Sequence, residues 1–257
     1  MGTKGFFTDT TLCIGCKACE VACKQWNQLP DDGFRFTGMS YDNSEHLGSS
    51  TWRHVSFLER PMALGMQTTG AGNFSWLMMS DVCKHCARAG CLESCPTGAL
   101  VRTEFGSVYV QPDVCNGCGY CVSACPFGVI DKREDDGRAW KCTLCYDRLK
   151  ADMIPACAKS CPTESIQFGD LVQLRVRAQK RVDDLHRRGT GEAYLYGVDQ
   201  PGTEGLNAFF LLVDKPEAYN LPPDPVVPTK KVKRSWASLA TAAVAMAALA
   251  VAAVTGA

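Results

Sequence analysis

Apolar and polar positions alternate differently in different parts of this chain. Two short strand-like runs lie at 51–58 and 75–79, and turn signals such as Pro30-Asp31-Asp32-Gly33 precede them. A mostly apolar run at 206–213 predicts a buried strand. We therefore expect a strand-containing insertion early in the chain and one core strand late in it.

One segment has the periodicity of an amphipathic helix. Asp170 precedes this segment as an N-cap and Gly189 follows it, so we expect a helix between them. The opposite face carries several Arg and Lys residues, and we interpret that face as solvated rather than as a binding surface. The apolar residues that define the buried face are Leu171, Leu174, Ala178, Val182 and Leu185.

The last part of the chain has a different composition. The proline-rich stretch 221–229 predicts an extended linker, and a basic segment, 230–234, follows it. From Ser235 to Ala257 no residue is charged. As a helix this segment would reach roughly 35 Å at about 1.5 Å per residue, enough to cross a hydrocarbon core of about 30 Å. We expect a transmembrane helix at 235–257; a soluble helix docked on a partner is the alternative, because many alanines make insertion only weakly favourable.

Composition and charge exclude several classes of protein. Lys+Arg 27 and Asp+Glu 27 cancel, so the chain lacks the basic excess of a nucleic-acid-binding protein, and we expect no nucleic acid as a partner. A hydrophobic content of 46% excludes wholesale disorder. Residues 1–13 contain no apolar segment, cleavage site or twin arginine, so we expect the thiols to meet a reducing cytosol first.

The 16 cysteines fall into four groups of four, and three residues separate the last two cysteines of each group. Groups one and three share the spacing C-x2-C-x2-C-x3-C and a glycine two residues after the first cysteine, Gly15 and Gly117, which indicates an internal repeat. Groups two and four both end in Cys-Pro-Thr. In chain order the groups are Cys13, Cys16, Cys19 and Cys23; Cys83, Cys86, Cys91 and Cys95; Cys115, Cys118, Cys121 and Cys125; and Cys142, Cys145, Cys157 and Cys161.

This spacing is typical of iron-sulfur ligation. A C-x2-C-x2-C loop wraps three corners of a cubane [4Fe-4S] cluster, and in ferredoxin-type runs the fourth cysteine, followed by proline, binds the partner cluster. Zinc held by four thiolates would use paired C-x2-C knuckles. A disulfide scaffold would require closely spaced cysteines of one loop to bridge without strain. We therefore expect four [4Fe-4S] clusters, with zinc and disulfides as the weaker alternatives.

The ferredoxin-type interlock assigns ligands to each cluster. Groups two and three are neighbours in the sequence, so we expect them to share two clusters and the outer groups to share the other two. Group four departs from the ideal run, because eleven residues lie between Cys145 and Cys157. The assignment is Cys83, Cys86 and Cys91 with Cys125; Cys95 with Cys115, Cys118 and Cys121; Cys13, Cys16 and Cys19 with Cys161; and Cys23 with Cys142, Cys145 and Cys157.

The predicted fold class is α+β with much irregular structure: two interlocked ferredoxin-like 2[4Fe-4S] modules and a C-terminal transmembrane helix. The expected boundaries are an outer module of 1–40 with 140–220, an insertion at 41–82, an inner module at 83–139, a linker at 221–234 and the transmembrane helix at 235–257.

A few other residues stand close to the cysteines. The histidines lack metal-ligand spacing, and we interpret His85, inside group two, as tuning a potential rather than binding iron. Lys17, Lys84 and Lys141 each adjoin a cysteine, where they either offset the negative charge of the clusters or are simply solvated. Clusters with cysteine at every corner leave no open site for substrate, which favours electron transfer over catalysis.

The four motifs resemble those of the four-cluster iron-sulfur subunits of molybdopterin oxidoreductases, the DMSO reductase family. The resemblance rests on the cysteine groups, on 141–148 (KCTLCYDR) and on Cys161-Pro162-Thr163. Trp26-Asn27, Tyr41-Asp42-Asn43, the segment 216–225 and the apolar tail are most similar to the beta subunits of respiratory membrane-bound formate dehydrogenases. Nitrate reductase relatives have tryptophan where Cys118 stands, which disfavours that branch and a three-iron cluster.

The resemblance implies a complex with a division of labour. A catalytic subunit with a molybdenum or tungsten pterin cofactor oxidises formate, this non-catalytic chain conducts the electrons, and a membrane cytochrome b subunit reduces quinone in anaerobic respiration. It also implies that the outer pair of clusters faces the catalytic subunit and the inner pair the membrane. The alternatives are an equivalent subunit of a polysulfide, DMSO or hydrogenase-type complex, or a soluble polyferredoxin carrier.

Two arguments about membrane sidedness disagree. By the positive-inside rule, the basic segment 230–234 would keep the globular part on the cytoplasmic face. The resemblance implies export of the folded subunit on a twin-arginine signal of its catalytic partner, in agreement with the missing signal in residues 1–13. We expect a membrane-anchored protein with its globular part on the outer, periplasmic face, and the cytoplasmic face as the alternative.

Overall fold

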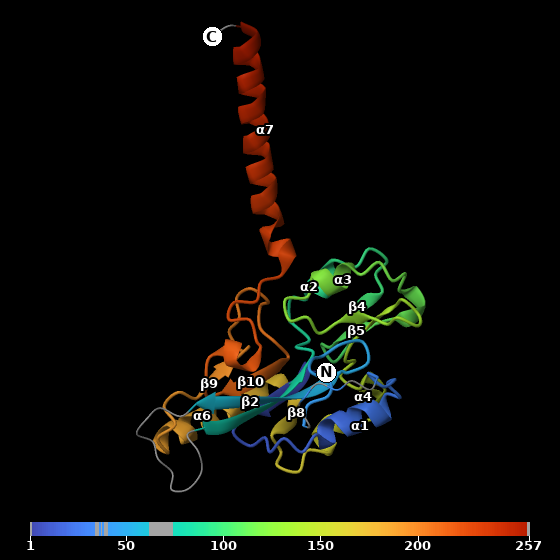
Figure 1. The fold of residues 1–257 in the computed structure, drawn as a ribbon, viewed down its shortest axis with the longest axis vertical. Coiled ribbons are helices and arrows are strands. Elements are labelled where there is room, and N and C mark those ends of the chain that lie inside the picture. Colours follow the sequence, from blue (N-terminus) through green and yellow to red (C-terminus); the bar gives the residue numbers. More distant parts are fainter. Residues whose placement is uncertain (1, 34–35, 37, 39–40, 62–73, 256–257) are drawn as a thin grey trace.

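A four-stranded sheet joins segments that are far apart in the sequence (Figure 1). Its central strand β1 pairs parallel with β10 and antiparallel with β8, and β10 pairs antiparallel with β9. The strands are, in spatial order, β8 (Ile166–Asp170), β1 (Lys4–Asp9), β10 (Ala208–Leu212) and β9 (Tyr194–Tyr196). The run at 206–213 was predicted to be a buried strand, and β10 is indeed buried at every position.

The computed structural model describes residues 2–33, 36, 38, 41–61 and 74–255. Its elements mix helices, strands and long irregular segments, so the predicted α+β class is confirmed at that level.

The amphipathic helix is α6 (Leu171–Arg187), and it covers the sheet. The Asp170 carboxylate accepts hydrogen bonds from the backbone N–H groups of Val172 and Gln173, as an N-cap does. The five apolar residues of the predicted stripe are all buried and pack against β1 and β10. The helix ends at Arg187, and Gly189 follows with a φ of +95°, so both predicted boundaries are confirmed.

The insertion contains an antiparallel hairpin of β2 (Arg53–Pro61) and β3 (Phe74–Val82). β2 begins two residues after the start of the predicted run 51–58 and continues three residues beyond its end, and β3 extends past both ends of the predicted run 75–79, because strand pairing continues through the residues at these ends. β2 also contacts α1 (Ala18–Trp26), and β3 contacts β1. Residues 62–73, which complete this predicted insertion, lie outside the described residues.

The inner module consists of short elements that connect its cysteine loops. Two small antiparallel hairpins, β4 with β5 and β6 with β7, alternate with two single-turn helices, α2 and α3, which contact each other. Their bounds are α2 (Gly90–Glu93), β4 (Leu100–Arg102), β5 (Val108–Val110), η1 (Pro112–Val114), α3 (Tyr120–Ser123), β6 (Asp131–Lys132) and β7 (Ala139–Trp140). Two further short helices, α4 (Tyr146–Lys150) and α5 (Ala156–Lys159), lead back to β8.

The first half of the segment predicted as a linker, 221–227, is irregular but packed on the body of the protein, whereas its second half forms η3 and the start of α7. Leu221 and Val227 are buried, and the Val227 N–H donates to the Gly202 carbonyl. Proline-rich composition predicted an extended backbone here, and the structure shows in addition that Leu221 packs in the core. Two 3-10 turns, η2 (Pro216–Tyr219) and η3 (Pro228–Lys231), bracket the packed segment.

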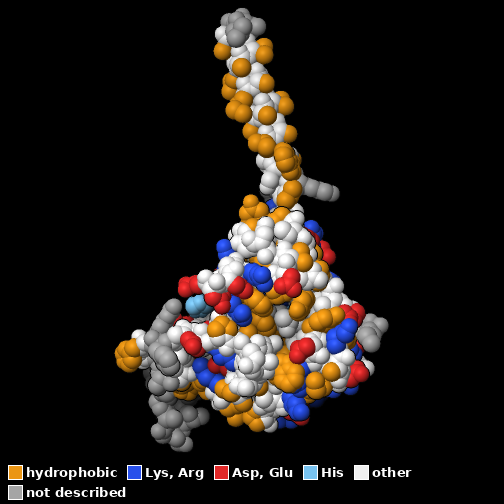
Figure 2. Space-filling model, turned by 90° about the vertical axis from the view of Figure 1, so that its right-hand side faces the viewer, with side chains coloured by type: hydrophobic (Ala, Val, Ile, Leu, Met, Phe, Trp, Pro, Cys, Tyr) orange, Lys and Arg blue, Asp and Glu red, His pale blue; other side chains and the backbone are white. Residues whose placement is uncertain are grey.

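The last helix, α7 (Val232–Thr255), projects from the body, and its apolar side chains lie exposed around it (Figure 2). It begins three residues before the predicted start at 235. Among the described residues, one stretch, Pro228–Val251, is long and apolar enough to cross a membrane by length and composition, with a mean hydropathy of 1.4. Its base adjoins the inner module, because η3 contacts α2 and Thr229 donates a hydrogen bond to Glu93.

Candidate metal centres

Four thiols from both ends of the outer module surround a cavity of about 20 Å³. Val55 of β2 and Ser80 of β3 help to line it. Three of the thiols precede or belong to α1, and the fourth follows α5. We call them the first set: Cys13, Cys16, Cys19 and Cys161.

A second set of thiols lies deeper in the outer module. Cys23 is on α1, Cys145 directly precedes α4 and Cys157 is on α5, and all are buried together with Cys142. The Cys23 thiol interacts electrostatically with the other three. The second set is therefore Cys23, Cys142, Cys145 and Cys157.

The third set lines another cavity of about 20 Å³, in the inner module. Lys84, His85, Phe127 and Lys141 complete part of its wall. The Cys86 thiol interacts electrostatically with the other three thiols. The third set is Cys83, Cys86, Cys91 and Cys125.

The fourth set gathers around α3. The Cys121 thiol, on that helix, interacts with the three thiols of the neighbouring loops. The fourth set is Cys95, Cys115, Cys118 and Cys121. All 16 cysteines of the sequence are free thiols and belong to one of the four sets.

The four sets follow one another in a row. Cys19 of the first set interacts electrostatically with Cys157 of the second. Cys142 of the second interacts with Cys83 of the third, and Cys91 of the third with Cys121 of the fourth. Cys16 and Cys118, which belong to the first and last sets, are the exposed cysteines. The row therefore runs through the interior and reaches the surface at both ends.

Burial makes most of these thiols hard to ionise. It raises the pKa of Cys19 and Cys91 to about 12 and that of Cys121 and Cys145 to about 11. A thiolate in such surroundings is stable when a metal takes up its charge, since a coordinating thiol loses its proton. No three His, Cys, Asp or Glu side chains of the described residues converge closely enough for a single metal ion. Sets of four thiols around a cavity fit a polynuclear cluster better than one zinc ion.

Glycines of the repeated loops allow the chain to pass close to its neighbours. Gly15 and Gly117 have φ angles of +66° and +73°, in the left-handed region that glycine adopts without strain. A Cβ at Gly15 would lie 2.6 Å from the Phe57 ring, and one at Gly117 would meet the Gly137 carbonyl oxygen. A side chain at either position would therefore displace the cysteine loop.

A buried arginine lies between the first and second sets. Arg53 of β2 is 1% exposed, and its Nη2 donates to the Cys157 Sγ at 3.2 Å. Its Nη1 donates to the Ser80 carbonyl at 3.2 Å, and its guanidinium lies over the Phe6 ring. Burial opposes the charge, but the thiolates of Cys157 and Cys19 raise the pKa of Arg53 above its ordinary value. Sequence reasoning missed this residue; the only signal was one arginine at the start of an apolar run.

Two of the three lysines noted in the sequence are buried beside the third set. Lys84 and Lys141 are 1% and 2% exposed, so neither is solvated. Lys84 pairs with Asp81 and lies 5.3 Å from the centroids of the Phe127 and Phe210 rings. The Lys141 ammonium donates to the carbonyl oxygens of Val108 and Cys142. Lys84 and Lys141 therefore fix positive charge beside the third set, as Arg53 does between the first and second sets.

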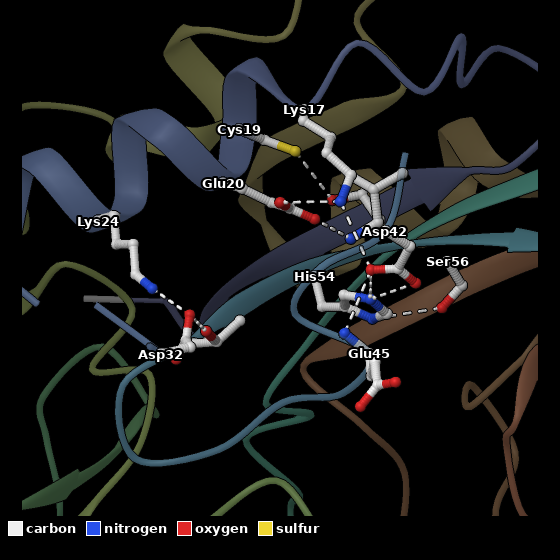
Figure 3. Close-up of polar contacts among 12 residues, drawn as sticks. Lys17, Cys19, Glu20, Lys24, Asp32, Asp42, Glu45, His54 and Ser56 are labelled. Atoms are coloured by element: carbon white, nitrogen blue, oxygen red, sulfur yellow. Dashed lines mark hydrogen bonds and ion pairs between the residues drawn. The ribbon is translucent and has the colours of Figure 1, made fainter. Parts of the chain in front are cut away.

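The third lysine belongs to a polar network that fastens the insertion to the first set (Figure 3). Lys17 pairs with Glu20 and Asp42, each at 3.5 Å. Asp42 also accepts from the buried His54 at 3.0 Å, and Glu20 accepts from the Val55 N–H of β2. The network joins α1, residues 42–45 and β2, and thereby holds Arg53 of β2 in place.

Comparison with known proteins gives the family of this protein. Two families, each described as "4Fe-4S dicluster domain", match residues 12–99 and 74–171. A "Formate dehydrogenase iron-sulfur subunit" of Haemophilus influenzae is 41% identical over 85% of this chain and 68% of the relative.

Two Escherichia coli proteins extend the comparison. The "Formate dehydrogenase-O iron-sulfur subunit" is 39% identical over 90% of this chain and 76% of the relative. The B subunit of the anaerobic dimethyl sulfoxide reductase is 35% identical over 66% of this chain and 75% of the relative. The resemblance read from the motifs is thus confirmed: this protein belongs to the family of formate dehydrogenase iron-sulfur subunits, which carry 4Fe-4S dicluster domains.

Proposed function

We propose that this chain relays electrons through four [4Fe-4S] clusters, from a catalytic subunit that oxidises formate at a molybdenum or tungsten pterin cofactor to a membrane cytochrome b or quinone-reactive subunit. Each of the four thiol sets holds one cluster. The observation that carries the proposal is the row of sets, buried in the middle and exposed at Cys16 and Cys118.

The clusters supply one-electron chemistry when bound, and the protein supplies their surroundings. The thiolates hold the iron, and apolar residues such as Val55, Leu144 and Ile130 keep water away from the interior of the row. Arg53, Lys84 and Lys141 place fixed positive charge beside the sets, which favours the reduced and more negative cluster. The chain itself carries no catalytic residue in this proposal.

The base of α7 suggests which end of the row faces the membrane. It adjoins α2, which carries Cys91 and is followed by Cys95 of the fourth set. If α7 crosses the bilayer, the fourth set is the end nearest the membrane, and the first set faces the catalytic subunit. This direction is the one that the family resemblance implies. The outer, periplasmic face remains our proposal for the globular part.

The test is anaerobic purification of the full chain from native membranes. We expect about sixteen irons per chain, paramagnetic signals of several interacting reduced cubanes, and a copurifying large subunit. Zinc in place of iron would contradict the proposal. So would a stable, detergent-free monomer without partners, which would indicate a soluble carrier.

The similarity to a dimethyl sulfoxide reductase subunit supports a second candidate, the same relay in another complex. Assays of the purified complex with formate, dimethyl sulfoxide, polysulfide and hydrogen separate the two candidates. We expect activity with formate. Activity with one of the other substrates alone would leave the relay intact and change its partner.

A further inference from the structure

His85 is a buried histidine in the wall of the third-set cavity. It is 1% exposed and lies between Lys84 and Cys86 of the group-two loop. Its φ of +44° is uncommon for a residue with a side chain, and this conformation is maintained by its surroundings. Arg102 donates to the carbonyls of Cys86 and Ala87 at 2.9 and 2.8 Å, so the loop is fixed directly after the histidine.

One nitrogen of the ring already has a partner. The backbone N–H of Val108, on β5, donates to Nδ1 at 3.1 Å. A nitrogen that accepts a hydrogen bond carries no proton, so the proton of the neutral ring must be on Nε2.

The other nitrogen has no partner among the described residues. Nε2 is buried and makes no hydrogen bond within that part of the chain. A buried N–H donor without an acceptor costs about 1–3 kcal/mol, so such donors nearly always have one. The imidazole lines the same cavity as Cys83, Cys86, Cys91 and Cys125, and these thiols would surround the sulfur-rich group proposed above.

We propose that His85 donates a hydrogen bond from Nε2–H to a sulfur atom of the cluster held by the third set. His85 is thus a positioning residue that stabilises the reduced form of one cluster. The electron adds to the cluster and the imidazole keeps its proton, so no proton is transferred. This inference rests on the proposed function, since it requires a cluster in the third set.

Two substitutions separate this role from a purely structural one. In His85→Asn, the side-chain oxygen can still accept from the Val108 N–H, but no donor reaches the position of Nε2. In His85→Gln, the longer amide can supply that donor, while the acceptor for Val108 is lost. A donor role and a structural role therefore predict opposite orders of effect. His186→Asn is the control, because His186 lies on α6 and its Nε2 bonds to the Ala193 carbonyl, away from the cysteine loops.

The measurement is a redox titration of the full complex, followed by electron paramagnetic resonance. For His85→Asn we expect the ratio of reduced to oxidised cluster to fall about tenfold at a given potential, which is ~59 mV for one electron. One of the four midpoints should move, and His85→Gln and His186→Asn should move it less. A larger shift in His85→Gln than in His85→Asn, or no shift in His85→Asn, would overturn the proposal.

A second readout uses the wild-type complex and does not depend on whether the variants fold. With histidine isotopically labelled in its ring nitrogens, pulsed resonance should detect one imidazole nitrogen coupled to a reduced cluster. Where His85→Asn assembles, that coupling should disappear. Absence of the coupling from a wild-type complex with its full iron content would refute the hydrogen bond alone, whereas missing iron would refute the proposed function.

Discussion

In the inner module, one short segment, 83–125, supplies every thiol of the third and fourth sets, whereas the outer module joins 13–23 with 142–161. The outer module also takes its buried cation, Arg53, from the insertion between them. Closing a long loop costs more conformational entropy than closing a short one. The comparison indicates that the inner module can organise from local contacts, while the outer module depends on the rest of the chain.

The apolar cores of the two modules also differ in how far apart in the sequence their residues lie. Thiols of the outer module are part of a large apolar cluster. It also contains Phe6 of β1, Val55 of β2 and Trp52, which directly precedes β2. The inner cluster combines residues of the hairpins β4–β5 and β6–β7 with thiols and neighbouring residues of the 83–139 segment. Loss of a cluster from the outer module should therefore disturb more of the protein than loss of one from the inner module.

The largest expected effect comes from removing one thiol in each module. Cys142→Ala removes a buried thiol that interacts with Cys145, Cys157 and, in the third set, Cys83. We expect it to lose roughly half of the iron, more than the about four irons of one cluster. Cys118→Ala, at an exposed thiol of the fourth set, should lose at most one cluster. Iron analysis and circular dichroism of anaerobically purified protein measure both, and equal losses would contradict the comparison.

The next effect concerns the buried arginine. Arg53→Met keeps much of the side-chain volume but removes the charge between the first and second sets. We expect the reduced-to-oxidised ratio of both clusters to fall about tenfold at a fixed potential, ~59 mV each. Redox titration with paramagnetic detection measures the shift.

The conservative variant Arg53→Lys separates charge from hydrogen bonding. It retains the positive charge but loses the fork that reaches both Cys157 and Ser80. We expect Arg53→Lys to return the midpoint potentials of both clusters most of the way to their wild-type values. If both variants behaved alike, the hydrogen bonds of Arg53, and not its charge, would set the potentials.

The contrast between cysteines and arginine explains what could be predicted from the sequence. The cysteine motifs are local spacing patterns, and the structure brings together the thiols that these patterns group, even across the long gap between Cys145 and Cys157. α6 was predictable for the same reason, because its cap and apolar stripe are local. The role of Arg53 depends on β2 lying across the outer module, a long-range arrangement that no local pattern encodes.

The order of the thiol sets was not predictable either. It depends on which loops touch, for example Cys142 against Cys83, and these residues belong to different modules. The packing of 221–227 on the body was missed because proline content indicates an extended backbone but does not indicate what its side chains contact. In both cases the arrangement depends on tertiary contacts of single residues, which local sequence patterns do not encode.

The smallest expected effect concerns Lys141, which lines the third-set cavity of the inner module. Its ammonium is held by two carbonyl oxygens, so part of its charge is already compensated, unlike that of Arg53, which faces thiols directly. Lys141 interacts electrostatically with Cys91 of the third set. For Lys141→Met we expect roughly a threefold fall in the reduced-to-oxidised ratio of the third cluster, because a partly compensated charge acts more weakly. Lys150→Met, at an exposed lysine, is the control and should have no effect. A shift for Lys141→Met as large as that for Arg53→Met would show that both modules tune their clusters by the same fixed charge, and the proposed difference between them would then lie in assembly alone.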